Sequence, residues 1–175
     1  MKRFRFRLRF PGAHIGRWAS RFADGGDDEE IERTVGAVAR RLGYLPKPEF
    51  LRLCRWKTPR SRPNVESNSA DFVAAVTATA LSTPDERLRV EVLTLLRGVH
   101  WPTASVILHF AHRDPYPILD VRALWSLGVV KPPPYGFDFW LAYTQTCRGL
   151  AAKHRCSMRT LDRALWQFSR ERQRD

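Results

Sequence analysis

The chain of 175 residues contains only three cysteines and no long apolar run. The cysteines are odd in number and form no Cys-x-x-Cys pair (Cys54, Cys147 and Cys156), so we expect reduced thiols in or near the core and no zinc site. Two histidines, His109 and His112, lie on one face of an expected helix, where a solvated or hydrogen-bonded pair is the simplest interpretation. We therefore expect neither a metal nor another cofactor.

Targeting and membrane signals are also missing. No apolar stretch approaches the roughly 18 residues of a membrane-spanning helix. The basic start of the chain lacks the apolar region and the small-residue cleavage site of a secretory signal. These absences predict a soluble, cytoplasmic protein with no membrane partner.

Acidic residues are few in comparison with basic ones. Lysine and arginine together number 30 and aspartate and glutamate 18, which gives a net charge of +12. This excess indicates a polyanionic partner, with nucleic acid ahead of a membrane surface. Of the 30 basic residues 25 are arginine, which suits bidentate phosphate contacts. A GC-rich genome would produce the same arginine bias without any functional meaning.

The first 22 residues contain no acid and carry a net charge of +7. Here arginine alternates with phenylalanine or leucine, and this period of two is typical of a strand and not of a helical transit peptide. We therefore assign residues 1–26 to a basic N-terminal arm or strand, with a possible short strand at 3–9. The alternative is an arm that becomes ordered only when its arginines meet phosphate: Arg3, Arg5, Arg7 and Arg9.

Helical periodicity covers almost all of residues 27–175 and predicts an all-α domain of about eight short helices. Glycines and prolines separate the helices, and the basic stretch 57–64, with two prolines, is expected to be a loop. The chain should finish with helices at about 137–153 and 157–172.

The segment 84–112 predicts two helices joined by a tight turn at residues 98–101. Gly98 permits the left-handed backbone that the turn needs, and Val99 can pack inward to hold the helices together. The N–H groups at the start of the second helix point outward, and such an end binds phosphate. Thr103 can add a hydroxyl contact.

Two motifs in this part of the chain resemble those of a known family. The pattern Leu-x-Gly-Val-x-x-x-Thr-Ala before an apolar helix, followed by Tyr-Pro-Ile-Leu-Asp-Val-Arg, resembles the signature of the helix-hairpin-helix (HhH-GPD) DNA glycosylase superfamily over about residues 88–128. The resemblance implies a DNA glycosylase-like domain at 27–175, with the hairpin at 84–112 and an aspartate-containing loop and helix at 115–128. In that superfamily the hairpin grips the DNA backbone and the aspartate lies beside the sugar of a flipped-out nucleotide. That catalytic position falls at Asp120.

The sequence departs from the family pattern at three points, and each restricts the activity that the resemblance implies. His100 replaces the second glycine of the family's turn, Pro102 stands where bifunctional members carry a Schiff-base lysine, and the cysteine spacing excludes an iron–sulfur cluster. The resemblance thus implies a monofunctional, cofactor-free DNA N-glycosylase. Such a protein hydrolyses the N-glycosidic bond of a damaged base in double-stranded DNA, as a monomer, in base-excision repair at a bacterial nucleoid. The alternatives are a non-catalytic nucleic-acid-binding protein that kept the hairpin, and an interaction protein whose charge is incidental.

The candidate site residues follow from these interpretations. Asp120 is the catalytic candidate, although it can also serve only as the cap of the helix 121–128. The DNA-binding candidates are five hairpin residues, three basic residues of the loop at 57–64 and one arginine two positions after Asp120: Gly98, Val99, His100, Trp101, Thr103, Lys57, Arg60, Arg62 and Arg122. The alternative for the three loop residues is that they are ordinary solvated surface charges without a partner in DNA. Three aromatic residues could stack on an extruded base or simply fill the core: Tyr116, Trp125 and Trp140.

Overall fold

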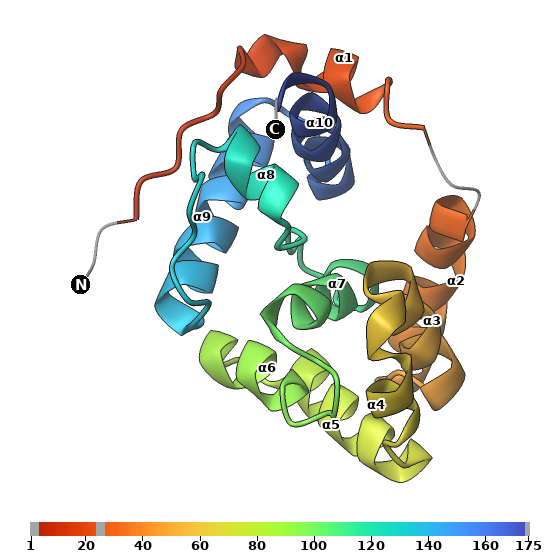
Figure 1. The fold of residues 1–175 in the computed structure, drawn as a ribbon. Helices are drawn as coiled ribbons and strands as arrows, with labels where there is room; N and C mark the ends of the chain where they lie inside the picture. The colour runs from red at the N-terminus through yellow and green to blue at the C-terminus, as the bar shows by residue number, and fades with distance from the viewer. Residues whose placement is uncertain (1–3, 24–26, 174–175) are drawn as a thin grey trace. The chain divides into compact units, whose positions relative to one another are not determined.

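The computed structural model describes residues 4–23 and 27–173. Within these ranges the chain forms ten α-helices and two 3-10 helices, with no strand (Figure 1), so the all-α prediction is confirmed. The residues fall into two compact units. We call residues 1–23 and 116–175 the terminal unit, and residues 24–115 the middle unit. None of the described helices is long and apolar enough to cross a membrane.

The middle unit is built around one largely buried helix, α7. Its helices are, in chain order, α2 (Asp27–Leu42), α3 (Lys47–Lys57), α4 (Arg62–Glu66), α5 (Ala70–Ser82), α6 (Glu86–Leu93) and α7 (Trp101–Ala111). Residues 103–108 of α7 are all buried, because α2, α3 and α6 each pack against it. A helix that is apolar on every side requires such a central position.

Two local predictions for the middle unit are wrong. The stretch expected to be a loop contains η2 (Pro59–Ser61) and the start of α4, because proline is tolerated in the first turn of a helix, where no N–H group is needed. The helix expected to run to Gly98 ends at Leu93. Residues 94–96 then bond to carbonyls three residues back, which tightens the chain into turns.

The terminal unit consists of η1 (Gly12–His14), α1 (Ile15–Ala19), α8 (Val121–Ser126), α9 (Phe137–Lys153) and α10 (Met158–Arg172). Helix α10 packs against α1, α8 and α9. The hydroxyl of Ser157 accepts a hydrogen bond from the Thr160 N–H at 3.0 Å and caps α10. The predicted ranges of the last two helices are confirmed.

The N-terminal arm is extended, but its described residues 4–9 form no strand, so the expected strand at 3–9 is wrong there; Arg3 lies outside the described residues. A strand needs a partner strand, and the arm pairs with the end of α8 instead. The N–H groups of Arg7 and Arg9 donate to the carbonyls of Leu127 and Ser126 at 2.8 and 2.9 Å.

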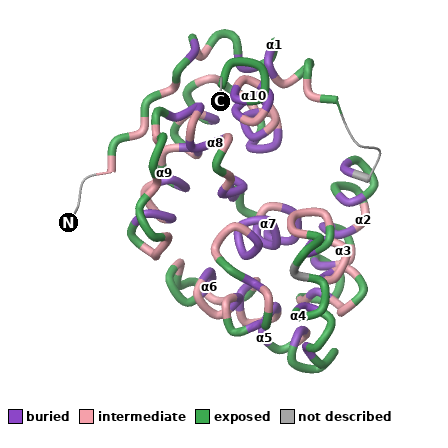
Figure 2. Tube along the Cα trace, in the orientation of Figure 1, coloured by how far each residue is buried: buried purple, intermediate pink, exposed green. Residues whose placement is uncertain are grey.

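The alternation of arginine with apolar residues nevertheless gives the arm two different faces, one toward the protein and one toward solvent. Even-numbered residues are half-buried or buried, and the arginines between them are exposed, as the banding of the arm in Figure 2 shows. Phe6 lies 5.7 Å from the Phe139 ring, and Phe10 lies 4.7 Å from the Phe168 ring. These contacts hold the described part of the arm against its own unit.

Candidate nucleic-acid interface and the Asp120 site

The hairpin turn between α6 and α7 is built around Gly98. Its φ of +80° lies in the left-handed region that the turn was expected to require. The following Val99 is buried, and its N–H donates to the Leu96 carbonyl at 3.0 Å. The turn is therefore anchored from inside by two apolar side chains, Leu96 and Val99, each 1% exposed.

A second constraint at Gly98 comes from α4, which lies against the turn. A Cβ atom at Gly98 would stand 2.8 Å from Val65 Cγ1 and 3.0 Å from Asn64 Cβ. Both distances are shorter than ordinary van der Waals contact, so α4 approaches the hairpin as closely as a glycine permits.

The buried side chain of Asn68 clamps the turn from the same side. Its Oδ1 accepts from the Arg97 N–H at 2.9 Å, and its Nδ2 donates to the Arg97 carbonyl at 3.0 Å. Nδ2 also donates to the Val65 carbonyl at 3.0 Å. The side-chain amide thus pairs with both backbone polar groups of Arg97, as a residue on a neighbouring antiparallel strand would. Sequence reasoning missed this role of Asn68. The next residue, Ser69, caps α5 instead, and its hydroxyl accepts from the Phe72 N–H at 3.2 Å.

The start of α7 presents the positive end of the helix dipole. His100 is the N-cap residue; its backbone is extended and its side chain makes no capping hydrogen bond. The imidazole is exposed, whereas Trp101 is half-buried and Thr103 only 4% exposed. Thr103 therefore contributes packing, and His100 is the residue of this turn that offers a side chain to a ligand.

One basic candidate, Arg62, lies on α4, the helix that contacts the hairpin turn. Arg62 is the first residue of α4, two positions before Asn64, and it is exposed. Its ion pair with Glu66, at 2.7 Å and one helical turn away, is also exposed and contributes only about 0.3–0.5 kcal/mol. A phosphate can compete for this guanidinium. Arg97 and Arg60 are exposed, and Lys57 is half-buried.

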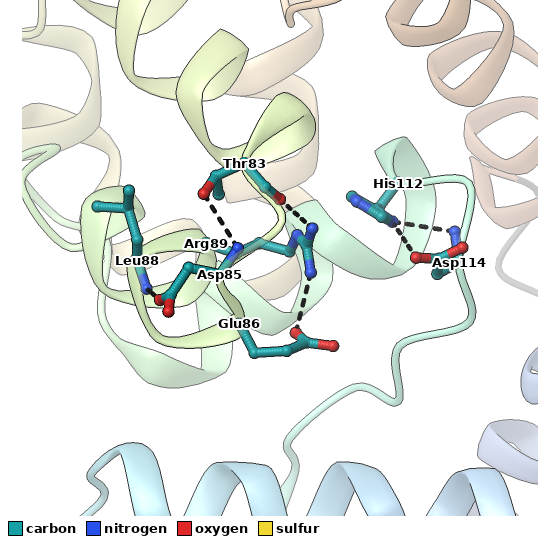
Figure 3. Close-up of polar contacts among 7 residues, drawn as sticks. All are labelled: Thr83, Asp85, Glu86, Leu88, Arg89, His112 and Asp114. Atoms are coloured by element: carbon teal, nitrogen blue, oxygen red, sulfur yellow. Dashed lines mark hydrogen bonds and ion pairs between the residues drawn. The ribbon is translucent and has the colours of Figure 1, made fainter.

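A polar network at the far ends of the hairpin helices stabilises them (Figure 3). Asp85 caps α6 by accepting from the Leu88 N–H at 2.7 Å. The buried guanidinium of Arg89 pairs with Glu86 at 3.1 Å and donates to the Thr83 carbonyl. Sequence reasoning missed this arginine, because nothing in its spacing distinguishes it from a surface charge.

His112, the residue that follows the end of α7, is buried. Its Nδ1 accepts the Asp114 N–H at 2.9 Å, so the ring carries its proton on Nε2. Burial, and next the charge of Arg89, lower the pKa of His112 below its ordinary value.

Asp120 lies in the terminal unit as the N-cap of α8. Its Oδ1 accepts from the Arg122 N–H at 2.8 Å, and its side chain is half-buried. Burial and then the charge of Asp120 raise the pKa of Tyr135, which places this phenol within the field of the carboxylate. The Tyr143 hydroxyl donates to the Ile118 carbonyl at 2.7 Å and holds the segment that leads into Asp120. The carboxylate is therefore oriented by its helix and remains in reach of solvent.

The three aromatic candidates for a base pocket lie in or against the core of the terminal unit. Tyr116 and Trp140 are 1% and 0% exposed and stack on each other at 5.8 Å. Trp125 is half-buried, with the Arg9 guanidinium 4.5 Å from its ring centre. The Arg122 guanidinium stands 5.5 Å from the Trp166 ring. In this conformation Tyr116 and Trp140 offer no exposed ring face to a base.

Comparison of the chain with protein families, curated proteins and solved structures found no match.

Proposed function

We propose that this protein binds DNA through the hairpin and acts as a monofunctional N-glycosylase on a damaged base, with Asp120 as the catalytic carboxylate. The observation that carries the proposal is the hairpin turn itself. Gly98 adopts a left-handed conformation, and α4 and Asn68 hold the turn so that α7 begins at an exposed histidine.

The hairpin would bind a backbone phosphate at the start of α7. The helix dipole and the outward-pointing N–H groups favour an anion there, and His100 can donate a further hydrogen bond. Arg97 and Arg62 add exposed cations on adjoining segments. These contacts carry no base specificity and serve to position the duplex.

Asp120 would supply the chemistry. As the bond between C1′ and the base nitrogen breaks, positive charge develops on the sugar, and a fixed carboxylate stabilises it. The same carboxylate can orient the water whose oxygen bonds to C1′ and accept its proton, while the departing base takes up a proton. The cap bond to the Arg122 N–H fixes one carboxylate oxygen in advance. Pro102 provides no amine, so strand cleavage through a Schiff base is not part of this proposal.

Two observations favour the second candidate, a nucleic-acid-binding protein without catalysis. Tyr116 and Trp140 stack on each other in the core, and capping α8 is by itself sufficient reason for an aspartate at position 120.

Base release in a single turnover tests the proposal. The substrates are duplexes that carry alkylated, deaminated or oxidised bases, and free bases are identified by mass spectrometry. Asp120→Asn removes the charge but keeps a good N-cap, because asparagine caps helices as well as aspartate does. The matched control is Asp85→Asn, which makes the same change at the cap of α6.

Release that is lost only with Asp120→Asn supports the glycosylase. Release that survives this substitution removes Asp120 from the mechanism. Binding without release by the wild-type protein favours the non-catalytic candidate.

A further inference from the structure

We propose that the outer edge of the N-terminal arm is a second nucleic-acid-binding surface, on which Arg5, Arg7 and Arg9 contact successive phosphates of one strand. The inference rests on the proposed function only in taking nucleic acid as the partner. It requires neither the hairpin nor catalysis at Asp120.

The three arginines line an open groove of about 550 Å³ together with Leu8, Leu127 and Gly128. All three arginines are exposed, and no acidic residue is among these lining residues. The groove is therefore a concave surface of one charge sign, which concentrates an anionic ligand.

The arm fixes the spacing of these cations. An extended chain rises about 3.3 Å per residue, so alternate side chains on one edge repeat at about 6.6 Å. This repeat is comparable to the separation of neighbouring phosphates along an extended nucleic-acid strand. A regular row of guanidinium groups can therefore follow the backbone without reading its bases.

Hydrogen bonds to the end of α8 hold the backbone of this row of arginines in place. The N–H groups of Arg7 and Arg9 bond to the end of α8, and the Arg9 Nε donates to the Trp125 carbonyl at 2.6 Å. Gly128 allows this close approach, because a Cβ there would stand 3.3 Å from the Arg7 carbonyl oxygen. Little ordering of the backbone is thus required on binding, which favours affinity.

The orientation of the apolar residues favours nucleic acid over a lipid surface. A peripheral segment that binds membranes turns its apolar side chains toward the acyl chains. In the arm these side chains face the protein instead. Phe4 and Phe6 contact Phe139, and Phe10 contacts Trp18 and Phe168.

The test compares two variants of the full chain that lose the same charge. Arg5→Gln/Arg7→Gln alters the groove but leaves Arg9, which also packs on Trp125. Arg17→Gln/Lys153→Gln removes two exposed cations of the same unit that do not line the groove. Binding of a single-stranded oligonucleotide and of a duplex is measured by fluorescence anisotropy over a series of salt concentrations.

The logarithm of the binding constant falls linearly with the logarithm of the salt concentration. Loss of two phosphate contacts makes this negative slope shallower by about 1.4 for a single strand and about 1.8 for a duplex. At about 0.1 M salt this corresponds to an affinity loss of an order of magnitude or more. We expect the groove variant to show this loss and the control variant to retain most of the wild-type slope. The oligonucleotide should also protect the arm of the wild-type protein from trypsin cleavage after Arg5 and Arg7.

Equal losses in both variants would show that only overall charge matters and would overturn the proposal, as would binding by the groove variant at wild-type strength. Binding of the wild-type protein to phosphatidylserine vesicles but not to oligonucleotides would also overturn it. A hairpin variant, His100→Ala, separates the two surfaces: if it weakens binding while the groove variant does not, the arm proposal fails and DNA binding through the hairpin stands.

Discussion

The contact between α4 and the hairpin turn makes Gly98 unusually sensitive to substitution, and a second glycine of the same unit provides the comparison. Gly98 and Gly43 have similar left-handed φ angles, +80° and +76°. A Cβ at Gly43 would meet no atom within 4 Å, whereas a Cβ at Gly98 would stand 2.8 Å from Val65 Cγ1 and 3.2 Å from the Val65 backbone nitrogen. Alanine at Gly43 therefore adds conformational strain alone, and alanine at Gly98 adds strain and a steric clash.

The magnitudes follow from these two contributions. A non-glycine residue in the left-handed region costs about 1–2 kcal/mol, and overpacking a close contact costs about 1–3 kcal/mol more. We expect Gly43→Ala to lower the free energy of unfolding by about 1–2 kcal/mol and Gly98→Ala by about 2–5 kcal/mol.

Urea unfolding, followed by tryptophan fluorescence and circular dichroism, measures both variants against the wild-type protein. Both substitutions lie in the middle unit, so a separate transition of the terminal unit would not obscure the comparison. Because the clash displaces the turn, Gly98→Ala should also weaken the proposed DNA binding more than Gly43→Ala does. Equal losses of stability would refute the reasoning, since they would mean that α4 does not press on the turn.

Two further predictions concern titratable groups. Since burial lowers the pKa of His112, the unfolded chain takes up a proton before the folded protein does as the pH falls below about 6.5. The contribution of His112 to the free energy of unfolding should therefore be complete above that pH and decline below it. Urea unfolding between pH 5 and 8 measures this decline, and His112→Gln should make it smaller. An unchanged pH profile in the variant would show that another group is responsible. Burial also raises the pKa of Cys54 to about 12 and raises that of Cys147, while Cys156 is only half-buried. Ellman's reagent at pH 8 should therefore modify one thiol quickly in the folded protein and all three in urea, and rapid modification of Cys54 or Cys147 under native conditions would contradict the buried positions.

The helical architecture was predictable because its signals are local. Apolar periodicity located α9 and α10 within a residue of their observed limits. The need for a left-handed residue in the hairpin turn likewise pointed to Gly98, because no other residue type adopts that conformation so readily. The exact ends of short elements were less predictable: α6 ends at Leu93 and not near Gly98, since hydrogen bonds three residues apart compete with helical ones over a single turn.

What the sequence alone determined about this protein is its helical class, its basic character and the two faces of its arm. Each of these depends on residue type and on spacings of two to four residues. The tertiary structure decided which segments meet: the arm pairs with the end of α8, Asn68 bonds to the Arg97 backbone, and Tyr116 stacks on Trp140. These partners are separated by between 24 and more than 100 residues along the chain. Contacts over such separations arise from the packing of whole helices, and no local pattern records them.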